Sequence, residues 1–327
     1  MKFSVGYQLE ESGNFLQTIM EHKDSIGEIY FSAPDIPNGR SNSWAAEFTR
    51  RTAAEEQEKE LKQLKEAGFK MNFLLNAMCY GADTLSKAFY SELGDTVDHY
   101  VEHFGVTSVT TTSPMIGKFL KDNFDGLLVR ASVNMEIGTV EGMEYIADFF
   151  DEYYMRRENN RDFAQIRKMH AWCQENGKKL HMLANSGCLN NCSAHVFHDN
   201  LVAHEQEILK RDNAYKFSGV CKKFLKNPEN HKKFLDYTNC IRPEDVSLYE
   251  LYFDSMKLAT RVHNAPDWIL RAYCGGRWLG NLAELLEPNH AEMLWPYIID
   301  NSLITSEVKD DKLVYAGMEE ALIKIEE

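Results

Sequence analysis

Two cysteines, Cys188 and Cys192, stand four residues apart directly after a strand-like run at residues 179–184. Thiolates this close along the chain can bind one metal ion, and Gly187 beside them permits a close approach of the backbone. Two further cysteines, Cys221 and Cys240, follow in the same long connection. Four thiolates suit an iron-sulfur cluster or a zinc ion, whereas buried structural cysteines are the alternative interpretation.

The spacing of these thiols favours a cluster over zinc. Structural zinc sites usually have a close pair of ligands in both halves, but Cys221 and Cys240 are isolated from each other by 19 positions. Three histidines near the first pair keep a mixed cysteine and histidine zinc site as the alternative; they are His195, His198 and His204. Cys79, which follows another strand-like run, is the substitute for Cys221 as a ligand.

The elements that must position these residues alternate regularly along the chain. Eight short apolar or β-branched runs are expected to form strands near residues 3–9, 28–33, 70–76, 107–112, 126–132, 153–157, 179–185 and 252–258. Helix-like segments lie between them, among them a charged amphipathic stretch at 43–67 that Gly68 terminates. This α/β alternation predicts a parallel sheet, and eight units in roughly 250 residues are typical of a (β/α)8 TIM-type barrel.

An open, doubly wound sheet is the competing architecture, but no Gly-x-Gly-x-x-Gly turn follows the first strand. We therefore expect a barrel domain over residues 1–286, with a long cysteine-bearing insertion at 187–251 between strands seven and eight. Residues 287–327 are expected to form a short C-terminal tail of helical and extended segments.

The active site of such a barrel lies at the carboxyl ends of its strands. Four side chains predicted at this end are candidates for catalysis, namely Glu136, Arg156, Asn185 and Arg261. The two arginines are suited to hold an anionic group in a bidentate manner, and Glu136 is suited to proton transfer. Strand ends are also polar simply because they meet solvent, so each residue has a structural interpretation as well.

Composition limits the environment and the partners. The chain has 327 residues, of which 44% are apolar and 26% charged, which is ordinary globular usage. Its net charge of -14 opposes general binding to a nucleic-acid backbone. No apolar run is long enough for a membrane span, and seven cysteines without a secretion signal indicate reduced thiols, so we expect a cytoplasmic protein with no membrane partner.

Basic residues gather around Cys221 in this otherwise acidic chain. Such a group could attract a phosphate-bearing substrate, or it could be a solvated helix face. Its members are Lys210, Arg211, Lys216, Lys222, Lys223, Lys226, Lys232 and Lys233.

Three segments resemble peptidase family U32, the collagenase-like proteins of bacteria and archaea. They are residues 183–192, the sequence Phe-His-Asp-Asn at 197–200, and the sequence Cys-Ile-Arg-Pro-Glu-Asp at 240–245. The resemblance implies a barrel and a 4Fe-4S cluster, held here by Cys188, Cys192, Cys221 and Cys240. Better-known members have the pattern Gly-Ala-x-Cys before the next cysteine, and this chain departs from it, which leaves Cys221 with the least support.

Several relatives of this kind take part in oxygen-independent hydroxylation of RNA bases or of a quinone precursor. We therefore expect an iron-sulfur enzyme of redox or hydroxylation type that acts on an anionic or aromatic small molecule or an RNA base, with a second U32-like subunit as a candidate partner. The first alternative is a collagenase-like peptidase. Neither a Gly-x-Ser-x-Gly nor a His-Glu-x-x-His motif occurs, so Cys188 would be its nucleophile, with His198 nearby. The second is a non-catalytic binding module that zinc stabilises.

Overall fold

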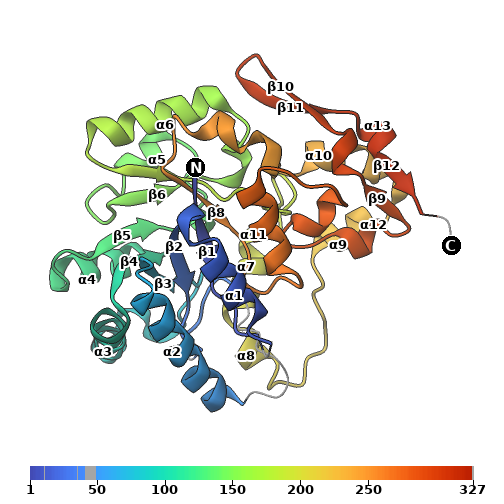
Figure 1. Ribbon diagram of the computed structural model, residues 1–327. Coiled ribbons are helices and arrows are strands. Elements are labelled where there is room, and N and C mark those ends of the chain that lie inside the picture. Colours follow the sequence, from blue (N-terminus) through green and yellow to red (C-terminus); the bar gives the residue numbers. More distant parts are fainter. Residues whose placement is uncertain (11, 35, 41–48, 326–327) are drawn as a thin grey trace.

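A computed structural model describes residues 1–10, 12–34, 36–40 and 49–325 of the chain. Eight parallel strands form one sheet that curls into a barrel, with helices around it (Figure 1). The strands β1 to β8 are Lys2–Gly6, Ile26–Phe31, Met71–Leu75, Val106–Thr111, Leu128–Ala131, Glu152–Tyr154, Lys179–His181 and Ser255–Leu258. Each overlaps one of the eight expected runs, so the predicted α/β barrel is confirmed.

The barrel closes between β7 and β8. The sheet order runs from β7 through β6, β5, β4, β3, β2 and β1 to β8. Just beyond β7, Leu183 forms a parallel bridge with Lys257 of β8. The Ala184 amide donates to the Lys257 carbonyl at 2.9 Å, and the Lys257 amide donates to the Met182 carbonyl at 2.9 Å. These bonds join the two ends of the sheet.

Side-chain caps fix where the larger helices of the barrel begin. The hydroxyls of Ser86 and Ser113 accept from the backbone at the starts of α3 and α4, and the Asp162 carboxylate does so for α6. Helices α1 to α6 are Asn14–Glu21, Arg50–Glu66, Lys87–Phe104, Pro114–Asn123, Val140–Glu144 and Phe163–Glu175. The helix expected at 43–67 is thus confirmed as α2, while residues 43–48 lie outside the described part of the chain.

Alternation along the strands divides the core into two regions. Outward side chains such as Ile29, Phe73 and Val109 are fully buried against the helices. Inward side chains are mostly polar, and Arg130 lies among them, 4% exposed. Its guanidinium contacts Glu28 across the barrel at 2.6 Å and Glu152 on the neighbouring strand at 2.6 Å. The barrel is therefore filled by a paired layer of charges below its mouth.

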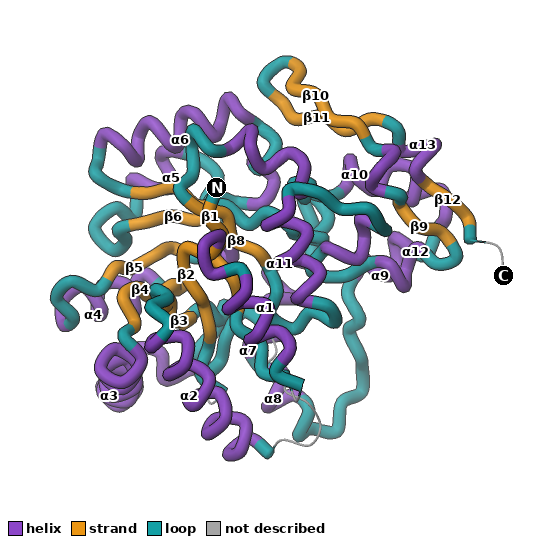
Figure 2. Tube along the Cα trace, viewed as in Figure 1, coloured by secondary structure: helices purple, strands orange, loops and turns teal. Residues whose placement is uncertain are grey.

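The insertion between β7 and β8 consists of loops and short helices (Figure 2). Its α-helices α7 to α10 are His195–Ala203, Glu205–Ile208, Val220–Leu225 and Phe234–Tyr237. Helix α11, Pro266–Gly275, follows β8 and is the last helix of the barrel.

The C-terminal region packs on the barrel and on the insertion (Figure 1). It contains helical and extended segments, as expected for residues 287–327. They are α12 Ala291–Leu294, β9 Tyr297–Ile299, β10 Thr305–Lys309, β11 Lys312–Ala316, α13 Met318–Ala321 and β12 Leu322–Lys324. The Leu313 amide donates to the Arg161 carbonyl at 2.9 Å, so β11 is attached directly to the loop before α6.

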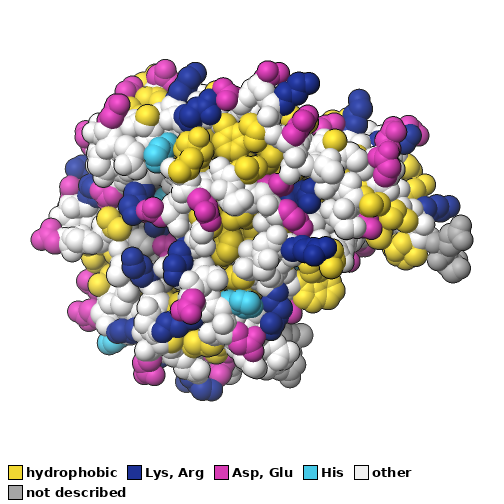
Figure 3. Space-filling view, turned by 45° about the horizontal axis from the view of Figure 1, so that its top comes forward, with side chains coloured by type: hydrophobic (Ala, Val, Ile, Leu, Met, Phe, Trp, Pro, Cys, Tyr) yellow, Lys and Arg dark blue, Asp and Glu magenta, His cyan; other side chains and the backbone are white. Residues whose placement is uncertain are grey.

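Charged side chains of both signs are interspersed with hydrophobic ones on the face drawn in Figure 3. Within the described ranges, none of the helices has the length and apolar character that a membrane crossing requires.

Candidate functional site

A cavity of about 50 Å³ lies at the carboxyl ends of the strands, where barrel enzymes carry their active sites. Every strand except β1 and β4 contributes a lining residue, either directly or from the few residues after it. The lining residues are Tyr30, Gly39, Arg40, Leu74, Asn76, Val133, Asn134, Arg157, Leu183, Lys257, Ala259, Arg261 and Glu287.

Arg157 forms one wall of this cavity and is 3% exposed. Its guanidinium donates to the Glu136 carboxylate at 2.8 Å and to the Asn134 side-chain oxygen at 2.8 Å. The Nε of Arg157 is buried and has no hydrogen-bond partner in the structure. Among the described residues, one donor of this arginine therefore has no acceptor.

His195, at the start of α7, lies between two carboxylates. Its ring nitrogens are 3.2 Å from Glu136 and 3.1 Å from Asp199. These hydrogen bonds, the one to Asp199 first, raise the pKa of His195 to about 10. Because the imidazole is then protonated near neutral pH, His195 acts as a fixed cation here and is unsuited to be a general base.

Arg40 and Glu287 come together from distant parts of the chain. The Arg40 Nε is 3.4 Å from a Glu287 oxygen, and an Arg40 Nη lies 4.0 Å from Asp199. Burial raises the pKa of Glu287, and Arg40 opposes that rise. Gly39 fits this crowded loop because a Cβ there would lie 2.8 Å from the Asn134 amide nitrogen.

Lys257 and Arg261 are the cations of the cavity that form no ion pair with a carboxylate among the described residues. Arg261 donates to the Ser32 hydroxyl at 2.6 Å, while its buried Nε has no partner in the structure. Lys257 is 7% exposed, and its Nζ lies 3.9 Å from the centre of the Tyr30 ring. Burial and the nearby charge of Arg261 lower the pKa of Lys257 to about 7.

The cavity is therefore strongly cationic. Four of its lining residues are basic, Arg40, Arg157, Lys257 and Arg261, whereas Glu287 is its acidic one. This contrasts with the net charge of -14 of the whole chain. Buried cations without matching carboxylates cost free energy in the empty site, and an anionic ligand would offset that cost.

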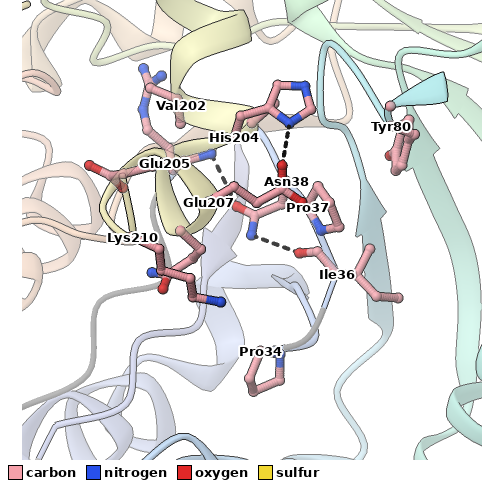
Figure 4. A pocket seen from close by; sticks show the side chains of 14 residues that line it. Pro34, Ile36, Pro37, Asn38, Tyr80, Val202, His204, Glu205, Glu207 and Lys210 are labelled. Carbon is pink, nitrogen blue, oxygen red and sulfur yellow. Dashed lines mark hydrogen bonds and ion pairs between the residues drawn. The ribbon is translucent and has the colours of Figure 1, made fainter. Parts of the chain in front are cut away.

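A second, larger cavity of about 240 Å³ borders the first, because Arg40 lines both. It lies between the loop after β2 and the chain around α8. Figure 4 shows Lys210 and Tyr80 on opposite sides of this cavity. Of the basic group expected around Cys221, Lys210 lines this cavity, and all eight members are exposed to solvent.

The four residues expected to line the catalytic cavity have different places. Arg261 lines it, and Glu136 lies behind Arg157. Asn185 is fully buried and structural, since its side chain bonds the backbone of Ala259 in both directions and donates to the Leu285 carbonyl at 2.9 Å. Arg156 lies outside the cavity lining, 3.3 Å from Glu158.

Three of the four expected cysteine ligands lie near one another. Burial raises the pKa of Cys221, and the neighbouring thiols of Cys188 and Cys192 raise it further. Cys188 also lies close enough to Arg40 for its negative charge to raise the pKa of that arginine. The thiols at the start of the insertion are thus adjacent to the barrel mouth.

Cys240 is fully buried, and its sulfur lies 3.5 Å from an Arg161 Nη and 3.7 Å from the Thr238 hydroxyl. In the part of the chain that the structure describes, no three His, Cys, Asp or Glu side chains are grouped as a metal site would require. The side chains as placed therefore do not form a complete ligand set, and the cluster at Cys188, Cys192, Cys221 and Cys240 stays a prediction. Zinc stays the alternative to it.

Comparison with known proteins identifies relatives of this chain. No protein-family model matches it. An uncharacterized protease of Methanocaldococcus jannaschii is 28% identical over 295 residues, which cover 86% of this chain and 81% of that protein. A solved structure of a U32 peptidase is 15% identical and aligns with a TM-score of 0.56 over 79% of this chain and 91% of that one. The chain is similar to these two proteins and shares the fold of the U32 peptidase. The family resemblance found in the sequence is confirmed.

Several residues that line the cavity are not among the expected site residues. Arg157 is adjacent to the expected Arg156, and Lys257 lies within an expected strand. Arg40 follows strand β2 in the sequence Pro-Asn-Gly-Arg, a polar turn at a strand end that could have indicated it. Glu287 had no such signal, because it falls one residue beyond the expected end of the barrel.

Proposed function

We propose that this U32 relative is an enzyme that binds a small anionic molecule at the carboxyl end of its barrel. The observation that supports this most is the pair of buried basic side chains, Lys257 and Arg261, that form no ion pair with a carboxylate among the described residues. The free Nε atoms of Arg157 and Arg261 add two donors that an anion can accept from. The barrel supplies the enclosed position in which such interactions are strong.

Replacement of Arg261 tests this proposal. We expect inorganic phosphate to raise the melting temperature of the wild-type protein and to bind roughly tenfold or more weakly to Arg261→Gln, since a charge-assisted hydrogen bond contributes about 1.5–3 kcal/mol. Titration calorimetry measures the affinity. Arg156→Gln is the matched control, because that arginine lies outside the cavity lining. Absence of phosphate binding, or an equal loss in both variants, would contradict the proposal.

We propose further that Cys188, Cys192, Cys221 and Cys240 hold a 4Fe-4S cluster, with Cys79 as the substitute for Cys221. The support is the proximity of the first three thiols to one another and of Cys188 to Arg40 at the mouth. A bound cluster would supply electron transfer. The chain would then be a redox or hydroxylation-type enzyme whose substrate is an anionic or aromatic small molecule or an RNA base.

Metal analysis of protein prepared without oxygen distinguishes these candidates. We expect iron and sulfide to copurify with the chain and to be lost in Cys188→Ala. Cys173→Ala is the matched control, since that thiol is buried in α6, where burial raises its pKa to about 12. Zinc in place of iron would support the metal-stabilised binding module, and protein free of both metals would exclude the cluster.

Peptidase activity is the alternative that the name of the relative suggests. The thiol of Cys188 would be its nucleophile, with His198 as the base. Burial and the charge of Arg40 lower the pKa of His198, so its ring is neutral and able to accept a proton. Peptide hydrolysis that persists after rigorous purification and disappears in Cys188→Ser would favour this function over the first.

A further inference from the structure

Lys257 has an environment that differs from that of an ordinary structural lysine. Its Nζ lies over the rings of Tyr30 and Tyr154, 3.9 Å and 5.1 Å from their centres. The Nζ of Lys257 forms no hydrogen bond or ion pair with the side chains or backbone that the structure describes, yet Lys257 lines the cavity at the barrel mouth. The small apolar cluster of Val133, Tyr154 and Leu183 is at the same end of the barrel.

The charges that face this amine come from four elements around the barrel. Arg261, Arg130 and Arg157 repel a positive charge on Lys257, and Glu28 attracts it. Glu28 is already engaged by Arg130 at 2.6 Å and by the Ser4 hydroxyl at 2.7 Å. Desolvation and the arginines therefore prevail, and the pKa of Lys257 falls to about 7. A large fraction of the amine is then uncharged, and hence nucleophilic, at neutral pH.

The cavity also limits the size and chemistry of what can reach this amine. Its volume of about 50 Å³ compares with the roughly 10–15 Å³ that one water needs, so it holds a group of a few heavy atoms. Arg261 lies near enough to influence Lys257 and has an unused donor. A carboxylate on the guanidinium of Arg261 would place an adjacent carbonyl carbon beside the amine.

We propose that Lys257 is a nucleophile that forms an imine with the carbonyl carbon of a small 2-oxo acid bound in this cavity. This rests on the proposed anionic site. The neutral amine adds to the carbonyl, a carbon–nitrogen bond forms, and the carbonyl oxygen leaves as water with the two hydrogens of the amine. Glu287 lines the same cavity, and its raised pKa suits it to carry protons during this exchange. Protonation of the imine nitrogen, with Glu287 as the proton donor, gives an iminium that withdraws electrons from the neighbouring carbons and activates them.

Reductive trapping tests the proposal. The full-length protein is incubated at pH 7 with pyruvate or with glyoxylate, the smaller probe, in the presence of cyanoborohydride, and lysine modification is mapped by mass spectrometry. We expect Lys257 to be modified at least tenfold more than any other lysine and phosphate to suppress the modification. Lys178 is the internal control, because burial also lowers its pKa but its Nζ donates to the Ala147 and Phe150 carbonyls.

One variant, together with the outcomes for the wild-type protein, separates this inference from the proposed function. Lys257→Arg fills the same place with a side chain that cannot form an imine, so it should show no modification at residue 257. If the wild-type protein binds phosphate but Lys257 is modified no more than Lys178 or the exposed lysines by either probe, the imine inference is overturned and the anionic site stands. If phosphate does not bind and Lys257 is not modified, both fail.

Discussion

At the scale of single residues, the site is defined by cations whose charges the fold leaves unbalanced. Arg157 and Arg40 are each paired with a carboxylate, whereas Lys257 and Arg261 form no such pair with any residue that the structure describes. A buried unpaired ammonium destabilises the folded state, because water solvates its charge more strongly than the interior of the barrel does. Side chains that destabilise the folded state and make no structural contact in compensation are typical of functional sites.

Lys257→Met should therefore stabilise the protein. The folded-state pKa of about 7 lies below the ordinary 10.5, so the unfolded chain binds more protons between these values and wild-type stability rises with pH across that window. We expect Lys257→Met to gain about 1–4 kcal/mol at pH 7, with the gain shrinking toward pH 10. Urea unfolding at several pH values measures it. Lys179→Met, at an exposed pair with Asp254, should change little at any pH.

At the scale of elements, the strands place a buried ionic layer directly below the cavity. Arg130 of β5 holds Glu28 of β2 and Glu152 of β6, and His181 of β7 contacts Glu152 at 2.9 Å. Although burial opposes ionisation, Arg130 holds the pKa of Glu28 below its ordinary value, and His181 and Arg130 do the same for Glu152. Four strands are thus linked through their inward side chains, and this layer is the floor of the site.

Arg130→Met should be among the most destabilising single changes in the barrel. It leaves two buried carboxylates without their cation, which costs about 3–5 kcal/mol at pH 7. The stability that Arg130 confers is present above the ordinary glutamate pKa and is lost as pH falls through the lowered values, so the deficit should shrink below about pH 4.5. Unfolding in urea at pH 7 and pH 4 tests this. Adding Glu28→Leu and Glu152→Leu to Arg130→Met should recover part of the lost stability. If neither the lower pH nor these two added substitutions reduce the deficit, the argument is contradicted.

The elements themselves could be predicted, because period-two alternation and helix caps are local signals. All eight strands overlap their expected runs, but the orientation of side chains beyond a strand end could not be predicted. Tyr154 faces into the barrel, so Arg156 would also face inward if β6 continued. The strand ends at Tyr154, however, and the alternation ends with it. Arg157 therefore lines the cavity in place of Arg156. The importance of Lys257 was equally hidden, since its burial depends on closure of the barrel by distant segments.

At the scale of the whole molecule, the C-terminal region is part of the site. Ser186 forms a parallel bridge with Glu287, and the Glu287 amide donates to the Asn185 carbonyl at 2.9 Å. Gly187 permits this approach, since a Cβ there would lie 2.3 Å from the Pro288 carbonyl oxygen. We expected a boundary at residue 286, and composition could not indicate that Glu287 pairs with Ser186, because the two residues are distant in the sequence.

Tyr315 of β11 joins the C-terminal region to the barrel and to the cysteine-bearing insertion. Its ring lies 4.2 Å from the Arg161 guanidinium carbon and 5.8 Å from that of Arg242, and its hydroxyl accepts from the Arg242 amide at 3.1 Å.

Tyr315→Ala should destabilise the protein by about 2–4 kcal/mol through lost packing and cation–π contact, and Tyr315→Phe by about 1 kcal/mol through the hydroxyl alone. Because this contact connects the regions, near- and far-ultraviolet circular dichroism should report one common unfolding midpoint that moves down in Tyr315→Ala. A C-terminal transition that shifts while the barrel midpoint stays fixed would show that the two regions unfold independently.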